Sequence, residues 1–446
     1  MLLTMPSEQR DALTVAVVGL GKIGLPLAAQ FAGKGTSVIG CDVLADVVAT
    51  INAGHSHIHE EPGLEEAVAA AVAAGRLRAT VDTTAAVTAA DVVVVIVPLM
   101  VDARRAIDFS ILDSATNAIA RGIHRKSLVI YETTLPVGTT RNRIGPMLEQ
   151  GSGLKLGVDF DLAFSPERLY AGRVFEDLRR YPKIVGGVDD ASTDRAVEFY
   201  KRVLDAEVWP VANSETAEFA KLAETTYRDV NIALANQLAV YGGSRSVDVQ
   251  QAFRAANSQP YSHLHRPGIG VGGHCIPVYP HFLLRDAVDG ELDLVRIGRS
   301  TNDGMADRSI DVLRTALGGL AGRRVLVLGA AYREDVKEMA MSSAIPIVER
   351  LHREGAHVLI HDPYFKPTEL AGLEAEVADL DAPPAVDAIV VQAFHHQYRD
   401  LDWSRFRGLK AVFDGRGTVD PEPVRKAGAR YLAVGLPAAE GTPPGR

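Results

Sequence analysis

The sequence predicts an α/β protein with two Rossmann-like lobes, each a doubly wound parallel sheet, joined by a long central helix in a helical middle domain. In the N-terminal part, short β-branched runs alternate with alanine-rich helical stretches. Such alternation requires right-handed crossovers and places the strands parallel to one another. The same pattern returns after Arg323, whereas the region 214–239 between the two parts shows helical periodicity without any strand pattern.

Composition supports an ordinary soluble globular protein, with 47% apolar and 23% charged residues. The chain has 446 residues, which at roughly 150 per domain predicts two or three domains. We expect an N-terminal α/β domain over 1–210, a helical middle domain over 211–310 and a C-terminal α/β domain over 311–446. Only two cysteines are present, so a disulfide framework is excluded and a reducing compartment is indicated.

Charge and hydropathy exclude two classes of partner. The formal charge is −9, from 47 basic and 56 acidic residues, and this balance argues against nucleic-acid binding. The longest apolar stretch, 92–101, contains Pro98 and is too short to cross a bilayer. Because residues 1–11 also lack a signal-peptide pattern, we expect a cytoplasmic protein with no membrane partner. We also expect no metal centre, since a chain of this length buries enough surface to need no metal for stability.

The expected strands of the N-terminal lobe are apolar without alternation, as strands buried on both faces are. They cover residues 14–18, 37–39, 92–97, 127–131 and 162–164. Helices are expected over 25–32 and 64–74.

The central helix is expected over 214–239. Asn213 or Ser214 can cap it, and Glu215 and Glu218 fall in its first turn, where the helix dipole favours anions. In the C-terminal lobe, a helix is expected over 344–354. The strands expected there cover residues 324–329, 357–361, 388–391 and 411–413.

A dinucleotide fingerprint follows the first strand. Gly19 permits a tight turn, Gly21 lets the backbone approach a pyrophosphate, and Gly24 lets the next helix pack on the sheet. Asp42 ends the second strand, at the spacing of an acid that binds ribose hydroxyls. That acid would repel a 2′-phosphate, so the motif favours NAD over NADP. The alternative is a tight turn without a ligand.

A glycine-rich segment leads to the second cysteine. Cys275 follows His274, and an ionised thiol there could add to a carbonyl carbon. The alternative is a buried cysteine in a glycine-rich turn, and Cys41 is expected to be a packed, inert side chain. Glycines are costly in regular elements and are expected here where the chain packs against a ligand. They are Gly268, Gly270, Gly272 and Gly273.

Three further features carry candidate catalytic groups. Lys221 and Thr225 are four residues apart on the central helix and share a face; the lysine could stabilise an oxyanion or could be an ordinary solvated side chain. The threonines of 133–140 follow a strand and are expected at the carboxyl edge of the sheet. Glu167 also follows a strand and could act as a general base, or simply pair with Arg168.

Together these motifs resemble the nucleotide-sugar 6-dehydrogenase family, part of the UDP-glucose/GDP-mannose dehydrogenase superfamily. The segments 228–236 and 272–277 look most like the UDP-N-acetylmannosamine and UDP-N-acetylglucosamine branch. The matching pieces, in the order of the family, are 19–24 with Asp42, 133–140, 165–168, 221–222, 272–277 and 327–332.

The resemblance implies a four-electron oxidation of the sugar C6 alcohol to a uronate, with two NAD per turnover, as in polysaccharide biosynthesis. Cys275 would form a thiohemiacetal and then a thioester. Lys221 would hold the oxyanion, and Glu167 and Thr134 would place or activate water. The resemblance also implies that 1–210 binds NAD and that 311–446 binds the nucleotide sugar. It implies that 211–310 is the dimerisation domain, in which the long helix pairs two subunits into a homodimer.

The residues expected at the site form three groups. The catalytic group is Cys275, Lys221, Glu167, Thr134 and Thr225. The cofactor-binding group is Gly19, Gly21, Lys22, Ile23, Gly24, Asp42, Pro98 and Thr133. The substrate-binding group is Arg168, Lys221, Gly268, Gly270, Gly272, Gly273, Tyr332 and Arg333.

The sequence departs from the family pattern at several positions. Thr225 stands where the family usually has asparagine, and Tyr279 stands where it often has aspartate. Where many members read Asp-x-Arg, this chain has Glu338-Met-Ala340, and Pro98-Leu-Met replaces Pro-Thr-Pro. Two alternatives therefore stay open: a UDP- or TDP-glucose 6-dehydrogenase, and a protein that binds NAD and a nucleotide sugar without turnover.

Overall fold

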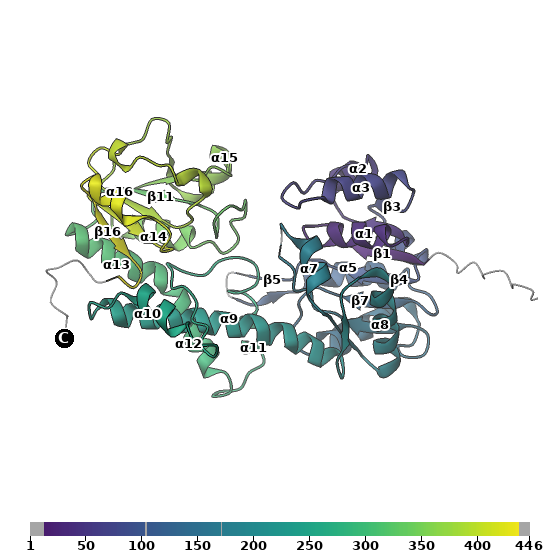
Figure 1. Ribbon diagram of the computed structural model, residues 1–446. Helices are drawn as coiled ribbons and strands as arrows, with labels where there is room; N and C mark the ends of the chain where they lie inside the picture. Colours follow the sequence, from purple (N-terminus) through teal and green to yellow (C-terminus); the bar gives the residue numbers. More distant parts are fainter. Residues whose placement is uncertain (1–12, 103–104, 171, 437–446) are drawn as a thin grey trace, which may run out of the picture. The chain divides into compact units, whose positions relative to one another are not determined.

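The computed structural model describes residues 13–102, 105–170 and 172–436, and they form two compact units. The first unit runs to Glu224 and includes 281–285, and the second contains 225–280 and the chain from Asp286 onward. In Figure 1 the colours follow the sequence, from purple near the N-terminus to yellow near the C-terminus. The expected absence of a signal peptide concerns residues outside this described part.

An eight-stranded sheet forms the centre of the first unit, in the order β10-β9-β8-β7-β4-β1-β2-β3. The strands are β1 (Thr14–Val18), β2 (Ser37–Cys41), β3 (Leu77–Thr80), β4 (Val92–Val95), β7 (Leu128–Tyr131), β8 (Asp161–Phe164), β9 (Lys183–Gly187) and β10 (Val208–Pro210). Five of them confirm predicted strands. The central β4 is four valines, all buried between β1 and β7, as expected for a parallel sheet covered on both faces.

One pair of strands in this sheet is antiparallel. β9 runs opposite to β8, with Ala163 facing Gly187 and Phe164 facing Gly186. The apolar patterns did not predict β3, β9 or β10. Strand β9 begins at Lys183, whose charge interrupts the apolar run that predicts a buried strand. The reversal brings the first residue of β9 to the edge where β8 ends.

Helices cover the sheet of the first unit, and a short hairpin of β5 (Met100–Val101) and β6 (Ile107–Asp108) follows β4. The helices are α1 (Gly24–Gly33), α2 (Ala45–Asn52), α3 (Leu64–Ala73), α4 (Thr83–Thr88), α5 (Ser110–Ala120), α6 (Gly145–Ser152), α7 (Val174–Arg180) and α8 (Asp190–Val203). A π-helical turn, η1 (Thr140–Ile144), precedes α6. Leu25, Leu27 and Phe31 of α1 are fully buried in the core.

The second unit contains a six-stranded sheet, entirely parallel, in the order β13-β12-β11-β14-β15-β16. The strands are β11 (Arg324–Leu328), β12 (His357–His361), β13 (Glu376–Val377), β14 (Ala388–Val391), β15 (Ala411–Asp414) and β16 (Arg430–Ala433). The helices around it include α10 (Val249–Ala256), α12 (Asp293–Asp303), α13 (Met305–Leu317), α14 (Ala344–Arg353), α15 (Pro367–Leu370) and α16 (Pro421–Lys426). The four strands and the helix predicted for this lobe are confirmed.

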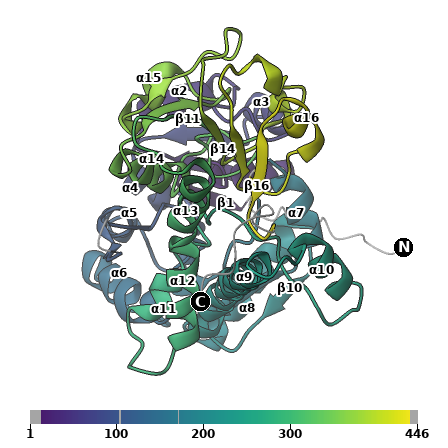
Figure 2. The same ribbon diagram turned by 90° about the vertical axis from the view of Figure 1, so that its left-hand side faces the viewer.

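The long helix α9 spans Ser214–Gly243, slightly beyond its predicted end. Asn213 caps it, because its Oδ1 accepts the N–H of Thr216 at 2.8 Å. Figure 2 shows α9 nearly end-on, with α12 beside it. Asp229 of α9 forms a buried ion pair with Arg299 of α12 and accepts from Asn302 Nδ2 at 2.8 Å, so a polar network joins the two helices.

Among the described residues, no helix is both long and apolar enough to cross a membrane.

Candidate active site

The turn between β1 and α1 contains three glycines with different roles. Gly19 has φ +96°, and a Cβ there would lie 2.3 Å from the carbonyl oxygen of Ile96. A Cβ on Gly24 would lie 1.9 Å from the carbonyl oxygen of Gly19, whereas a Cβ on Gly21 would meet nothing within 4 Å. Gly19 and Gly24 are therefore required by packing, and Gly21 leaves backbone open to a ligand. This arrangement fits the pyrophosphate of a dinucleotide.

Asp42 lies directly after β2, beside this turn. Its Oδ2 accepts the N–H of Leu20 at 3.1 Å, and its Oδ1 accepts the N–H of Leu44 at 3.0 Å. The side chain is half-buried. These two bonds orient the carboxylate while leaving it accessible to the hydroxyls of a ribose. Nearby, Lys22 Nζ lies 3.9 Å from Glu60 Oε1.

Two threonines follow β7 at the carboxyl edge of the same sheet, as predicted. Thr133 Oγ1 donates to the carbonyl oxygen of Val97 at 2.6 Å, next to Pro98. Thr134 is buried beside it. The strand order places β7 between β4 and β8, so these residues lie at the same edge as Glu167, which follows β8.

The loop after these threonines is held by the first turns of α9. Glu218 accepts from Gly138 N at 2.5 Å, from Thr140 N at 2.8 Å and from Thr140 Oγ1 at 2.6 Å. Burial raises the pKa of Glu218 to about 7. Glu215 forms a two-pronged pair with Arg141, with Nε–Oε1 at 2.6 Å. The sequence suggested only a dipole role for these glutamates, but both bind this loop.

Glu167 makes a different ion pair from the one considered in the sequence. Its Oε2 lies 2.7 Å from Lys183 Nζ, and its Oε1 accepts the backbone N–H of Arg168 at 2.8 Å. The guanidinium of Arg168 instead donates to the carbonyl oxygen of Pro182 at 2.5 Å and lies 3.9 Å from Glu224. The alternative of a side-chain pair between Glu167 and Arg168 is therefore wrong.

Lys221 is buried, with 8% of its surface exposed, and Thr225 follows it by four residues on α9 and is also buried. The alternative of a solvated surface lysine at 221 is therefore wrong. A buried lysine side chain suits the stabilisation of an oxyanion.

In the second unit, Cys275 is partly exposed. Its carbonyl oxygen accepts the N–H groups of Val278 at 3.2 Å and Tyr279 at 2.9 Å. The ring of the preceding His274 lies 3.2 Å from Glu338 Oε2 through Nε2. Cys41, by contrast, is 1% exposed, and burial raises the pKa of its thiol to about 12. Of the two thiols, only Cys275 is accessible for chemistry.

The glycines before Cys275 pack closely against protein, which is enough to explain why glycine stands there, and their contact with a ligand stays a prediction. A Cβ on Gly270 would lie 2.4 Å from Ser343 Oγ, and a Cβ on Gly272 would lie 2.6 Å from Tyr332 Cβ. Cβ atoms on Gly268 and Gly273 would come within 3.3 Å and 3.0 Å of neighbouring atoms. Gly270, Gly272 and Gly273 therefore fit the segment closely against the loop that follows β11, whereas Gly268 fits it against the turn after β15.

Arg416 holds this segment in place, and the sequence reasoning missed it. Its Nη1 donates to the carbonyl oxygen of Gly270 at 2.9 Å, and its Nη2 donates to that of Tyr332 at 3.2 Å. Burial lowers the pKa of its guanidinium to about 10. Arg333 Nε donates to Tyr332 Oη at 3.2 Å. The only signal for Arg416 was its position after a buried strand.

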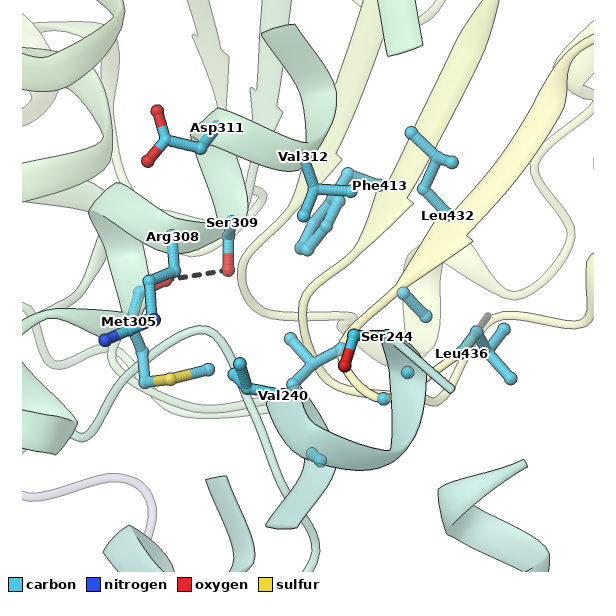
Figure 3. Close-up of a pocket in the computed structure, with 15 residues that line it drawn as sticks. Val240, Ser244, Met305, Arg308, Ser309, Asp311, Val312, Phe413, Leu432 and Leu436 are labelled. Atoms are coloured by element: carbon cyan, nitrogen blue, oxygen red, sulfur yellow. Dashed lines mark hydrogen bonds between the residues drawn. The ribbon is translucent and has the colours of Figure 1, made fainter. Parts of the chain in front are cut away.

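An apolar pocket beside α9 contains none of the predicted site residues. This cavity of about 360 Å³ is lined by α9, α13, β15 and β16. Figure 3 shows Val240, Met305, Val312 and Phe413 around it, and Ser309 donates to the carbonyl oxygen of Met305. Among the described residues, no three His, Cys, Asp or Glu side chains are placed to hold a metal ion.

Comparison with known sequences agrees with this geometry. Three profiles of the UDP-glucose/GDP-mannose dehydrogenase family match the chain: the NAD binding domain over 13–204, the central domain over 215–304 and the UDP binding domain over 326–421. The chain belongs to this family. It is an NAD-dependent oxidoreductase that acts on a nucleotide sugar.

Particular relatives are similar over nearly their whole length. The chain is 35% identical to a UDP-N-acetyl-D-mannosamine dehydrogenase from Pyrococcus horikoshii, over 92% of this chain and 97% of the relative. It is 34% identical to an NDP-N-acetyl-D-galactosaminuronic acid dehydrogenase from Ralstonia solanacearum, over 91% and 96%.

Solved structures are similar over the same extent. The structure of the Pyrococcus horikoshii UDP-D-ManNAc dehydrogenase aligns with a TM-score of 0.84 at 31% identity, covering 95% of this chain and 99% of that one. A UDP-glucose dehydrogenase from Pyrobaculum islandicum aligns with a TM-score of 0.85 at 28% identity, covering 97% and 100%.

Proposed function

We propose that this protein oxidises the C6 alcohol of a UDP-N-acetylhexosamine to the uronate, with UDP-N-acetylmannosamine or UDP-N-acetylglucosamine as substrate. The observation that carries the proposal is the accessible Cys275 at the end of a closely packed glycine segment, in contrast to the buried Cys41. The names of the relatives support the N-acetylated sugar.

The reaction that we propose at Cys275 consists of two oxidations and a hydrolysis. The alcohol first loses a hydride from C6 and a proton from its oxygen, which gives an aldehyde. The thiol adds to that carbon as a thiohemiacetal, and loss of a second hydride from the carbon and of the hydroxyl proton gives a thioester. Water then releases the carboxylate and the thiol. When bound at the Gly19–Asp42 turn, NAD supplies the hydride acceptor for both oxidations.

The other predicted residues have roles that their chemistry supports. Lys221 would stabilise the negative charge that develops on the substrate oxygen. Glu167 and Thr134 would orient and deprotonate the attacking water. Thr225 can offer one O–H in place of an amide. Tyr332 and Arg333 would bind the sugar or the diphosphate.

The stoichiometry of NADH tests the proposal. With UDP-N-acetylmannosamine and NAD, we expect two NADH per sugar and a uronate product; a ratio near one would mean that the reaction ends at the aldehyde. Cys275→Ser should allow at most the first oxidation, whereas Cys41→Ala should retain both. Full uronate formation by Cys275→Ser would exclude the thioester step.

Two alternatives are tested in the same assay. The first alternative is a UDP- or TDP-glucose dehydrogenase, and the similarity to the Pyrobaculum islandicum structure motivates it. A substrate panel that includes UDP-glucose and TDP-glucose distinguishes it from an N-acetylhexosamine dehydrogenase. Thr225 and Tyr279 motivate the second alternative, a binding protein without turnover. Binding of NAD with no NADH from any sugar, and with no change in Cys275→Ala, would support it.

We also propose that the protein is a homodimer that pairs through α9. Tyr227, Leu234, Leu238 and Tyr241 are exposed by 61%, 47%, 38% and 59%, and their spacing of seven, four and three places them on one helical face. Leu234→Glu should shift the sedimentation coefficient to that of a monomer, whereas Val158→Glu, at another exposed apolar residue, should not. A monomeric wild-type protein would contradict this proposal.

A further inference from the structure

Three buried ionisable groups meet where strands β7, β8 and β9 come together. Glu132 follows β7, Glu167 follows β8 and Lys183 begins β9. Strands β8 and β9 are antiparallel, and Phe164 pairs with Gly186. When this register is extended beyond the end of β8, Lys183 lies opposite Glu167. A parallel β9 would have placed its first residue at the other edge of the sheet.

The contacts within this group are short. Lys183 Nζ lies 2.7 Å from Glu167 Oε2 and 2.9 Å from Glu132 Oε2. Tyr200 of α8 donates from its hydroxyl to Glu132 Oε1 at 2.5 Å, and its ring centroid is 4.9 Å from the ammonium. The side chains of Lys183, Glu132 and Glu167 are 5%, 0% and 12% exposed.

The charges in this group do not balance unless one carboxyl group carries a proton. Two carboxylates that share one buried ammonium would leave a net negative charge away from water, which is costly. Burial raises the pKa of Glu132 even though Lys183 opposes that shift. Burial also opposes the ionisation of Glu167, but Lys183 and the N–H of Arg168 hold the pKa of Glu167 below its usual value.

The proton therefore belongs on Glu132, the carboxyl group farther from solvent, and Glu167 remains ionised at the edge of the sheet. Farther out, the guanidinium of Arg168 faces Pro182 and Glu224 rather than Glu167. Glu167 is thus kept ionised by its neighbours rather than by solvent.

We propose that Lys183 and Glu132 are positioning residues that hold Glu167 as an oriented base for the final hydrolysis, Lys183 through its ion pair and Glu132 by carrying the shared proton. This proposal rests on the function proposed above. In that step water adds its oxygen to the thioester carbon and gives one proton to Glu167. The carbon–sulfur bond then breaks, and its electron pair leaves on the sulfur of Cys275.

Removal of the ammonium tests this role. In Lys183→Met, the two carboxyl groups face each other without a cation, so Glu167 retains its proton to higher pH. We expect the hydrolysis rate at pH 7 to fall at least tenfold and the acid limb of its pH profile to move up by at least one unit. The first oxidation, measured as the first NADH in a single turnover, should change less than twofold.

Three further measurements complete the experiment. Intact-mass spectrometry of Lys183→Met quenched during turnover of UDP-N-acetylmannosamine should show the sugar attached to the protein, and the additional change Cys275→Ser should abolish that adduct. The exposed Lys201→Met, on α8, should behave as the wild type. If Lys183→Met does not fold, Lys183→Met with Glu132→Gln removes the excess buried charge and should restore the fold while keeping the shifted pH profile.

The outcomes separate this proposal from the one on which it rests. Should the wild type produce no second NADH and no Cys275 adduct, the proposed function fails. Should the wild type produce both, and either folded variant hydrolyse at an unchanged rate with an unchanged pH profile, only the role of Lys183 and Glu132 is overturned. A merely structural ion pair would lower the melting temperature without moving the pH profile.

Discussion

Each of the two sheets has the same glycine turn after its first strand, but the surroundings of the turn differ between the two units. Gly19 follows β1 with φ +96°, and Gly329 follows β11 with φ +92°. In both, an acid at the end of the next strand accepts backbone N–H groups of the turn: Asp42 in the first unit and Asp362 in the second.

The surroundings of the two acids differ. Asp42 is half-buried and accepts one N–H of its turn. Asp362 is 3% exposed, and its Oδ2 accepts the N–H groups of Ala330 at 2.8 Å and Ala331 at 2.9 Å. The buried His395 lies 2.9 Å from the same oxygen through Nε2. Its Nδ1 accepts the N–H of Asp335 at 2.9 Å, so Nε2 carries the proton.

The comparison teaches that a strand, a glycine turn and an acid do not by themselves make a cofactor site. In the second unit, protein donors already occupy the oxygen that could bind a ribose. In the first unit, the acid keeps an accessible face and Gly21 leaves the backbone open. The same local pattern is therefore structural in one unit and suited to ligand binding in the other.

The largest predicted effect is the difference in the free energy of unfolding between substitutions of Asp362 and of Asp42. Asp362→Ala leaves three buried donors without an acceptor and should lower the free energy of unfolding by about 3–5 kcal/mol. Asp42→Ala should cost less than about 1 kcal/mol but weaken NADH binding at least tenfold. Urea unfolding and fluorescence titration with NADH measure these effects. Equal destabilisation by the two changes would contradict the distinction.

Alanine substitution of the glycines comes next. Gly19→Ala and Gly329→Ala place a Cβ within 2.5 Å of a carbonyl oxygen at positive φ, so each should lose about 2 kcal/mol or more. Gly21→Ala should unfold as the wild type does, because its Cβ meets no protein atom, but it should bind NADH about tenfold more weakly. Normal binding by Gly21→Ala would show that the cofactor does not approach there.

The preference for NAD over NADP should depend on Asp42 and not on an unrelated acid of the first unit. Asp42→Ser removes the charge that repels a 2′-phosphate and should raise the ratio of kcat/KM for NADP over that for NAD about tenfold, which is about 1.4 kcal/mol. Asp205→Ser, which removes an exposed aspartate elsewhere in the first unit, is the matched control and should leave the ratio unchanged. An unchanged ratio in Asp42→Ser would assign discrimination to other residues.

The smallest effect is a dependence on pH in the second unit. Burial opposes ionisation of Asp362, but the bonds from His395 and Ala331 hold its pKa below the usual value. Its contribution to stability is therefore present above about pH 4, the unfolded value, and is lost as pH falls through the lower native pKa. The stability difference between the wild type and Asp362→Asn should shrink below pH 4; a constant difference would contradict this assignment.

Much of the fold follows from local patterns in the chain. Val92–Val95 could be recognised as a central strand because burial on both faces selects an unbroken apolar run. Lys183 and Glu132 could not be found in this way, since their partner lies on a different strand and a charge inside a strand pattern argues against burial. The role of Arg416 could not be predicted for the same reason, because it donates to carbonyl oxygens of residues that are far away in the sequence.

By itself, the amino-acid sequence determined the succession of strands and helices, the glycine turn with Asp42, and the two thiols from which one had to be chosen. Local sterics, hydrophobic periodicity and helix capping act over a few residues, so they can be read along the chain. Tertiary structure decided which acid stays accessible, that Cys275 is partly exposed, and that an antiparallel β9 brings Lys183 to Glu167. Burial and ion pairing depend on neighbours distant in sequence, and only folding brings those neighbours together.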